Sequence, residues 1–256
     1  MIEPSSHEPG RDERRVKAVV LAAGPGRRLG PLTRDLPKTL LPLGEGGTIL
    51  DLVLGNLTAV GVDEVAIVTG FAAERVDEAL PELEGRHGLR LAPILNERAE
   101  EWNNAHSLWL AREAFRDGAL LVNGDTVHPS SVETALLEAR DEGVLLAVDR
   151  SRPPGDEAMK VDLDREGRLM RIGKSLEEAD GEYIGVAFIG AAAADRLADA
   201  LETTWRRDPS LYYEDGFQEL VERGEDVRTA PIGSVDWVEV DDDADLARAR
   251  EIAWRS

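Results

Sequence analysis

The chain has 256 residues, of which 42% are hydrophobic, and this is enough for one large domain with a substantial core. Its formal net charge is -21 at pH 7, so nucleic acid and anionic membranes are not expected as partners. No apolar run reaches the length that a membrane span needs. The absence of cysteine excludes disulfides and thiolate metal sites, and it fits a reducing, cytoplasmic location.

The first part of the chain alternates between strands and helices. Residues 1–15 are polar, lack the apolar core of a secretion signal and are expected to form a flexible leader. The alternation that follows predicts a parallel sheet covered on both faces, with ligands at the C-terminal edge of its strands. The predicted strands are 16–22, 64–70, 89–95, 119–125 and 144–149, and the predicted helices lie at 49–60, 72–80, 103–115 and 130–143.

The pattern changes after residue 150. Residues 159–173 alternate around "DREG" and predict a hairpin. No linker, repeat or low-complexity tract is present, so a single domain over residues 16–256 is expected. The other predicted elements are strands at 182–190, 226–232 and 235–240 and helices at 191–205, 211–223 and from about 244.

The stretch "LAAGPGRRLGPLTRDLPKTLLPLG", Leu21 to Gly44, indicates a phosphate-binding loop. A dinucleotide fingerprint does not fit, because its third glycine comes one residue late and prolines disfavour the helix that should follow. A P-loop does not fit either, because Gly-Lys followed by Ser or Thr is absent. Gly24 and Gly26 allow backbone N–H groups to approach phosphate oxygens. The guanidinium of Arg28 can bind a triphosphate, and Lys38 adds a point charge.

This loop resembles the signature loop of the nucleotidyltransferases that activate sugar phosphates and related phosphates. The family pattern is L-A-A-G-x-G-[ST]-R-[LM], then P-L-T, then P-K-x-L-[LV]-P, and only Arg27 departs from it; Arg27 either contacts phosphate or is solvated. The resemblance implies a Rossmann-like, mixed and mostly parallel sheet flanked by helices, with a small acceptor-side β lobe. It assigns about 16–150 to nucleotide binding and 151–256 to acceptor binding. The nucleotide-binding residues that it implies are Leu21, Ala22, Ala23, Gly24, Gly26, Arg27, Arg28, Asn103, Asn104, Ser107 and Asp125.

Three carboxylates are candidate ligands of Mg2+, the expected cofactor. Asp125 follows a predicted buried strand in "VNGD", at the place where the family carries its metal aspartate. Near the C-terminus, "WVEVD" resembles the acidic strand end of these enzymes, and strand alternation directs Glu239 and Asp241 to one side. A turn or N-cap role for Asp125 and a solvated acidic strand end remain the alternatives.

Several segments resemble one branch of the family, the phosphocholine cytidylyltransferase-like enzymes. These segments are "NNAHSLWLA", "GEYIGVA", "YYED" and "WVEVD" followed by "DL". The branch uses CTP with phosphocholine, inositol 1-phosphate or aminoethylphosphonate-type acceptors. By this resemblance Asn103, Asn104 and Ser107 surround the nucleotide, and an amide can read a cytosine edge. The alternative is that one asparagine caps the following helix.

The acceptor side is less constrained by the pattern. Lys174 resembles the family lysine that meets the acceptor phosphate, and a surface lysine is the alternative. An aromatic cage with a carboxylate suits a quaternary ammonium, and Tyr183, Tyr212, Tyr213, Glu214 and Asp215 could contribute to one. Of these, Tyr183, Tyr213 and Glu214 are the acceptor-binding candidates. A core or interface position is the alternative for at least one of the adjacent tyrosines. Lys160 is a further acceptor-binding candidate, which would repel choline if it faced the pocket and would suit a polyol phosphate or a phosphonate.

The predicted function is Mg-dependent transfer of CMP from CTP to a small phosphorylated or phosphonate acceptor, with release of pyrophosphate. Arg28, Lys38 and Lys174 are the predicted catalytic residues. A sugar-1-phosphate thymidylyl-, guanylyl- or uridylyltransferase is one alternative, and a non-catalytic module that binds nucleotide sugars is another. A homodimer is compatible with the sequence.

Overall fold

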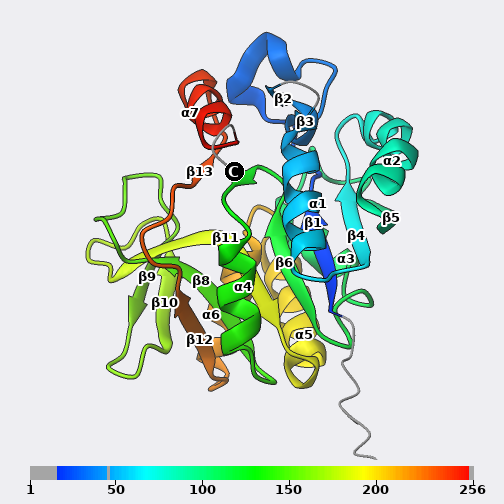
Figure 1. The fold of residues 1–256 in the computed structure, drawn as a ribbon. Helices are drawn as coiled ribbons and strands as arrows, with labels where there is room; N and C mark the ends of the chain where they lie inside the picture. Colours follow the sequence, from blue (N-terminus) through cyan, green and yellow to red (C-terminus); the bar gives the residue numbers. More distant parts are fainter. Residues whose placement is uncertain (1–15, 45–46, 254–256) are drawn as a thin grey trace, which may run out of the picture.

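The fold is organised around one mixed sheet, which within the described ranges has nine strands (Figure 1). The computed structural model describes residues 16–44 and 47–253, so the predicted leader 1–15 lies outside the described residues. Strand order is β10-β9-β11-β6-β1-β4-β5, and β11 also pairs with β8, which pairs with β12. These strands are β1 (Lys17–Leu21), β4 (Glu64–Thr69), β5 (Arg90–Leu95), β6 (Ala119–Asn123), β8 (Val144–Asp149), β9 (Lys160–Leu163), β10 (Leu169–Gly173), β11 (Gly181–Ile189) and β12 (Val227–Pro231).

Strand β11 reverses the direction of the sheet. Strands β6, β1, β4 and β5 are parallel to one another, and β12 is parallel to β8. Strand β11 is antiparallel to β6, β8 and β9, and β9 and β10 form the predicted hairpin. The mixed, mostly parallel sheet with a small β lobe is therefore confirmed, and β11 joins the lobe to the parallel part.

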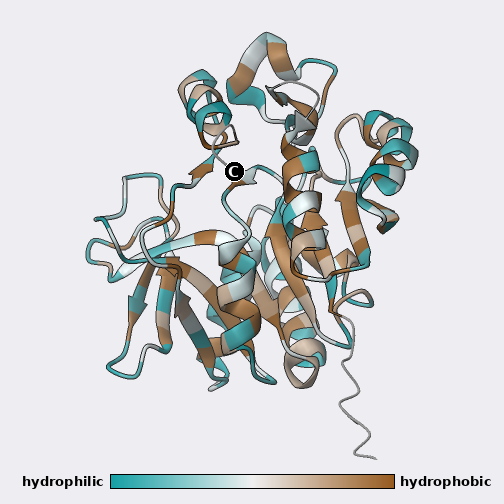
Figure 2. Ribbon diagram, viewed as in Figure 1, coloured by the Kyte–Doolittle hydropathy of each residue, from teal (hydrophilic) through white to brown (hydrophobic). Residues whose placement is uncertain are grey.

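Helices cover both faces of the sheet. Alternation along β1 sends Ala18 and Val20 into one core and Val19 into the other. Helices α1, α2 and α4 pack on the first face, and α3, α5 and α6 pack on the second. Figure 2 shows the apolar strands between the two helical layers. The helices are α1 (Ile49–Ala59), α2 (Ala73–His87), α3 (Asn104–Leu110), α4 (Ser131–Ala139), α5 (Ala191–Arg207) and α6 (Tyr213–Glu222).

Helix α1 begins at a capping box formed by Thr48 and Asp51. The backbone N–H of Asp51 donates to Thr48 Oγ1 at 3.1 Å, and Asp51 Oδ2 accepts from the Thr48 backbone N–H at 3.3 Å. The helix therefore starts at a fixed residue directly after the signature loop.

A third apolar cluster, here called the C-terminal cluster, joins the signature loop to the end of the chain. Helix α7 lies beside β2 and β13 above the sheet (Figure 1). The elements around the cluster are η1 (Arg27–Thr33) and η2 (Lys38–Leu40), which are 3-10 helices, β2 (Pro42–Gly44), β3 (Gly47–Thr48), β7 (Thr126–Val127), β13 (Val238–Glu239) and α7 (Asp243–Ala253). Its buried members are Leu29, Leu41, Leu43, Ile49, Val127, Val238, Val240, Leu246, Ala249 and Ile252.

Several predicted boundaries were wrong, and the predicted helix 130–143 already ends at Ala139. Helix α2 continues past Pro81 to His87, because Leu83 extends the buried stripe begun by Val76 and Leu80. The predicted helix 103–115 ends at Leu110 and is followed by turns. The predicted strand 235–240 is reduced to β13, because its partner β7 has only two residues.

Along the described chain, none of the helices combines the length and the apolar character that crossing a membrane requires.

Gly124 lies between the end of β6 and Asp125, where the backbone leaves no room for a side chain. A Cβ at this position would lie 2.7 Å from the Leu21 carbonyl oxygen. We expect Gly124→Ala to lower the free energy of unfolding, measured in urea, by about 1–3 kcal/mol, because the strand ends must move apart. Gly85→Ala in α2 is the matched control: a Cβ there would have nothing within 4 Å, and the change should stabilise by about 0.5–1 kcal/mol. A Gly124→Ala protein as stable as wild type would contradict this account.

Candidate active site

The signature loop, residues 21–44, folds so that its glycines serve two different purposes. Gly26 has a left-handed φ of 58°, and a Cβ there would lie 3.0 Å from Cβ of Lys38, so glycine lets the loop close on that lysine. Thr33 Oγ1 donates to the Gly26 carbonyl at 2.8 Å and fixes the same turn. Gly24 lines the cavity described below and has nothing within 4 Å of a Cβ position, so its backbone is open to a ligand.

Lys38 joins the loop to two of the predicted metal carboxylates. Its Nζ lies 2.7 Å from Asp125 Oδ2 and 2.9 Å from Asp241 Oδ1, and Arg28 lies 2.7 Å from the other oxygen of Asp241. The Lys38 side chain is only 11% exposed. Burial alone would lower its pKa, but the charges of Asp125 and Asp241 and their hydrogen bonds outweigh burial and raise the pKa above its ordinary value. Lys38 therefore stays charged between the carboxylates.

Backbone pairing brings the third carboxylate to the same place. Strand β13 pairs with β7 so that Glu239 lies opposite the residue that follows Asp125, and the Val240 N–H donates to the Asp125 carbonyl at 2.9 Å. Ligand oxygens of Asp125, Glu239 and Asp241 lie within 4.8 Å of one another. The pairing of two short strands thus brings Asp125 and Glu239 together, although they are more than 100 residues apart in the sequence.

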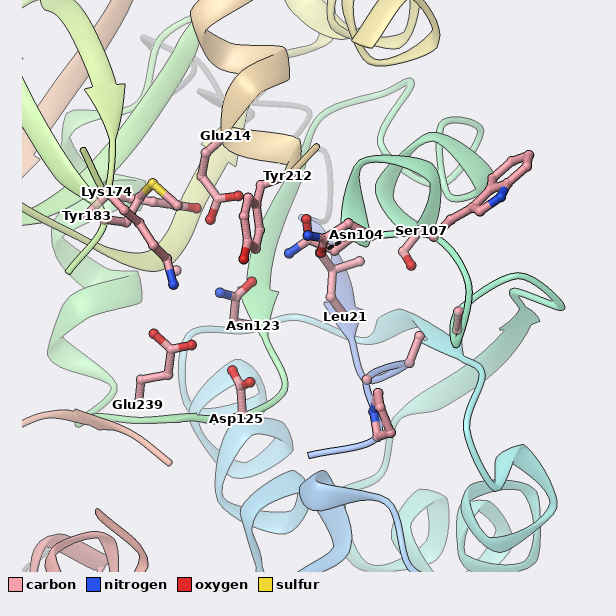
Figure 3. A pocket seen from close by; sticks show the side chains of 18 of the residues that line it. Leu21, Asn104, Ser107, Asn123, Asp125, Lys174, Tyr183, Tyr212, Glu214 and Glu239 are labelled. Atoms are coloured by element: carbon pink, nitrogen blue, oxygen red, sulfur yellow. Dashed lines mark hydrogen bonds between the residues drawn. The ribbon is translucent and has the colours of Figure 1, made fainter. Parts of the chain in front are cut away.

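The electrostatics of this cluster suit a divalent cation. Burial of the Glu239 carboxyl, reinforced by the charges of Asp125 and Asp241, raises its pKa to about 7. The residue as a whole is exposed, whereas its carboxylate points into the cavity (Figure 3). The pKa of Asp241 is lowered, because Lys38 outweighs the opposing effect of burial. Three carboxylates at this spacing form a hard-oxygen donor set of the kind that Mg2+ binds.

A cavity of about 220 Å3 opens above the carboxylates. One wall comes from the loop and the start of α3, and the other comes from β11, the hairpin and the start of α6 (Figure 3). The lining residues are Leu21, Ala23, Gly24, Pro25, Ala99, Trp102, Asn103, Asn104, Ser107, Asn123, Asp125, Glu157, Met159, Lys174, Tyr183, Gly185, Tyr212, Glu214 and Glu239.

On the predicted nucleotide side, side-chain hydrogen bonds hold the start of α3. Asn103 is the N-cap, and its Oδ1 accepts from the Asn104 N–H at 2.8 Å. Asn104 Oδ1 accepts from the Tyr213 backbone N–H at 2.9 Å, which ties α3 to α6. Ser107 Oγ accepts from Asn96 Nδ2 at 2.9 Å. All three predicted residues line the cavity, and Asn103 has the capping role that was the structural alternative.

On the predicted acceptor side, a lysine lies beside an aromatic ring. Lys174 Nζ lies 5.4 Å from the centroid of the Tyr212 ring, within the range of a cation–π contact. The same amino group is 3.9 Å from Glu157 Oε2, which is 84% exposed and therefore a weak partner. Lys174 thus lies at the cavity beside Tyr212, and Glu157 neutralises its charge only weakly.

Glu214 is buried in this wall and has one unpaired oxygen. The residue is 6% exposed, and its Oε2 has no hydrogen-bond partner among the described residues. Figure 3 shows its carboxylate directed into the cavity. Burial, together with the charge of Glu239, raises its pKa to about 8. A buried carboxyl without a full set of partners is costly, and a cationic ligand group would satisfy it.

Other predicted site residues lie elsewhere. Lys160 is not among the cavity-lining residues; strand alternation turns its neighbour Met159 to the cavity instead. Tyr213 is fully buried behind the wall, and Tyr212 takes the lining position. Arg27 is exposed and lies 3.6 Å from Glu100. Ala22 is buried beside the loop and does not line the cavity.

Seven lining residues were not predicted from the sequence: Pro25, Ala99, Trp102, Asn123, Glu157, Met159 and Gly185. For Asn123 a signal existed, since it precedes Asp125 by two residues at the ligand edge of the sheet. Which of the adjacent tyrosines lines the cavity depends on where the following helix starts: α6 begins at Tyr213, and Tyr212 before it lines the cavity. Nothing in the sequence distinguished Glu157.

The comparisons with known proteins agree with this geometry. Residues 17–155 match the model of the nucleotidyl transferase family. The chain is 32% identical over 248 residues to the CMP-5'-(3-aminopropyl)phosphonate synthase of Streptomyces rubellomurinus, which covers 91% of this chain but only 38% of that protein. It is 27% identical to the 2-aminoethylphosphonate cytidylyltransferase of Lancefieldella rimae, with 93% of both chains covered.

Among solved structures, the inositol-1-phosphate CTP transferase from T. maritima has a TM-score of 0.80 at 22% identity, covering 93% of this chain and 96% of that one. At this identity the likeness shows the shared fold. The family match spans more than half of the 256 residues. The chain therefore belongs to the nucleotidyl transferase family, in which it is similar to the cytidylyltransferase-like branch.

Proposed function

We propose that this protein is a Mg-dependent cytidylyltransferase that transfers CMP from CTP to a small acceptor with a phosphonate or phosphate at one end and an ammonium group at the other. Pyrophosphate is the second product. The observation that carries the proposal is the contact of Lys38 with Asp125 and Asp241, which joins the predicted phosphate-binding loop to the candidate metal ligands, and Asp125 also lines the cavity.

The residues have separable tasks in the transfer. The acceptor oxygen attacks the α-phosphorus of CTP, and the bond to pyrophosphate breaks without a covalent enzyme intermediate. Arg28 and Lys38 stabilise the negative charge that develops on the triphosphate, while Lys174 orients the acceptor. Asp125, Glu239 and Asp241 would hold Mg2+, which neutralises phosphate charge when it is bound.

The choice of CTP rests on the relatives. The Lancefieldella protein is named a cytidylyltransferase, and the name of the Streptomyces protein contains CMP. The start of α3 contributes amide and hydroxyl groups to the cavity, which suit a base edge. Thymidylyl, guanylyl or uridylyl transfer to a sugar 1-phosphate keeps the same reaction and is the nearest alternative.

The choice of an ammonium-bearing acceptor rests on Glu214. Its buried carboxyl group has one unpaired oxygen and lines the same cavity as Tyr183 and Tyr212, and such surroundings favour a cation. The argument against choline depended on Lys160, which does not line the cavity. The Streptomyces and Lancefieldella relatives are both named for aminoalkyl phosphonates, and this supports the same class.

The deciding experiment measures pyrophosphate release for a panel of nucleoside triphosphates against a panel of acceptors. The acceptors are 2-aminoethylphosphonate, 3-aminopropylphosphonate, phosphocholine, inositol 1-phosphate and glucose 1-phosphate. We expect turnover only with Mg2+, with CTP preferred and an amine-bearing acceptor preferred. Asp125→Asn is the negative control. Preference for GTP or dTTP would overturn the cytidylyl assignment, and binding of nucleotide sugars without any turnover would favour a regulatory module.

Lys38 and the divalent cation should neutralise the same carboxylates. We expect Lys38→Met to lower the free energy of unfolding by about 3 kcal/mol without metal, because Asp125 and Asp241 lose a buried counter-charge. Added Mg2+ should raise the melting temperature of this variant more than that of wild type. Lys17→Met, which breaks a more exposed pair with Glu64, is the control and should change stability by less than about 1 kcal/mol. If Mg2+ raised the melting temperature of Lys38→Met and of wild type by the same amount, Lys38 and the cation would not share a role.

We expect Glu214 to determine how tightly the enzyme binds the amino group of the acceptor. We expect Glu214→Gln to raise KM for 2-aminoethylphosphonate by about ten- to a hundredfold, because the ammonium loses a charged partner. KM for inositol 1-phosphate, if it is turned over, should change by less than about threefold. Glu222→Gln, at the exposed end of α6, is the matched control. A similar rise of KM for both acceptors would remove Glu214 from ammonium recognition.

The raised pKa of Glu214 also predicts a pH dependence of stability. Its ordinary pKa is 4.5 and its folded value is about 8, so between these pH values the folded protein holds a proton that the unfolded chain releases. Wild type should therefore lose stability relative to Glu214→Gln as pH rises from about 4.5 to about 8, with no further relative loss above that range. Chemical denaturation across this range measures the difference, and parallel curves for the two proteins would contradict it.

A further inference from the structure

Asn123 occupies the centre of the cavity floor, at the last position of β6. It lies beside Leu21 on β1, and it precedes the proposed metal ligand Asp125 by two residues. Its side chain lines the cavity between the predicted nucleotide wall and the predicted acceptor wall. The transfer as proposed gives this amide no task.

A glycine on the neighbouring strand makes room for the Asn123 side chain. Gly185 of β11 has a φ of +80°, and a Cβ there would lie 2.5 Å from Asn123 Nδ2 and 2.8 Å from its Cγ. The pairing of β11 with β8 changes register between Tyr183 and Ala187, so a bulge lies at this point. The close approach of the amide to β11 therefore requires glycine.

Two buried tyrosines fix the orientation of the amide. The Tyr213 hydroxyl donates to Asn123 Oδ1 at 2.9 Å, and it lies 3.1 Å from the Tyr183 hydroxyl. Because Tyr213 has a single hydroxyl hydrogen, it donates to Asn123 and accepts from Tyr183. Burial raises the pKa of both tyrosines well above the ordinary value, so both remain donors at neutral pH.

This arrangement turns the NH2 group of Asn123 toward the acceptor wall. Figure 3 shows its nitrogen directed toward the amino group of Lys174, above Asp125 and Glu239. Two donors, one neutral and one charged, thus face the same space next to the carboxylate cluster. An anionic oxygen there would be bound by both.

We propose that the Asn123 amide donates a hydrogen bond to a phosphonate or phosphate oxygen of the acceptor, alongside Lys174, and that Tyr213, Tyr183 and Gly185 position it. This inference rests on the proposed function and names a further recognition residue for its acceptor. A neutral amide orients the oxygen without adding a second positive charge, so the attacking oxygen keeps more of its electron density.

The test is a steady-state comparison with CTP, Mg2+ and 2-aminoethylphosphonate. Asn123→Asp has the same shape and still accepts from Tyr213, but it loses the donor and repels the acceptor. We expect KM for the acceptor to rise by about ten- to a hundredfold, with KM for CTP within about twofold of wild type. Gly185→Ala should reproduce part of this rise, because its Cβ displaces the amide while Asn123 itself is retained.

A double-mutant cycle separates positioning from general damage. Tyr213→Phe should raise acceptor KM by about three- to tenfold in wild type and have little effect when Asn123 is already alanine. Equal effects in both backgrounds, or a rise of KM for CTP as large as that for the acceptor, would overturn the inference.

The two levels of the proposal fail differently. A wild-type protein without turnover toward any acceptor would overturn the proposed function and the role of Asn123 together. An active wild type whose acceptor KM is unchanged by Asn123→Asp and Asn123→Ala would overturn only the role of Asn123. Melting curves of each variant establish that it is folded before its kinetics are compared.

Discussion

The placement of one ammonium group between two carboxylates organises the upper half of this molecule. Lys38 and Asp241 are separated by 203 positions in the chain, yet their charged atoms lie 2.9 Å apart. Without a positive charge, three carboxylates within 4.8 Å would repel one another strongly in a partly buried site. The loop and the C-terminal strand are therefore electrostatically dependent on each other.

Apolar packing holds these two charged segments in place. The C-terminal cluster contains residues of the loop, of β7, of β13 and of α7, so the lysine and the acids are carried on one packed unit. Trp237 adds an anchor next to β13, because its indole Nε1–H donates to Asp149 at 2.8 Å. The precise spacing of the charges thus depends on side chains that are themselves remote from the reacting groups.

Local patterns were sufficient to predict much of this arrangement. The alternation of buried strands and amphipathic helices predicted the parallel part of the sheet. The resemblance of the loop, of Asp125 and of the acidic strand end to the family predicted that Asp125, Glu239 and Asp241 meet. The sequence pattern did not predict which of two neighbouring side chains faces the cavity. Met159 lines the cavity where Lys160 was expected, and of the adjacent tyrosines only Tyr212 lines it, because strand phase and the first turn of α6 decide which neighbour faces inward. Asn123 escaped notice because its orientation is set by tyrosines 60 and 90 positions further along the chain.

The reversed direction of β11 has a consequence for how the molecule can diversify. This strand, the hairpin and the start of α6 form one wall of the cavity, and all of them follow residue 150. The loop and the start of α3 form the opposite wall, and the loop directly follows β1 of the parallel part of the sheet. Side chains on the β11 wall can therefore be exchanged while the loop, Lys38 and the carboxylates keep their spacing. Substitutions confined to the β11 wall could therefore change which acceptor shape fits, while the loop, Lys38 and the carboxylates stay the same.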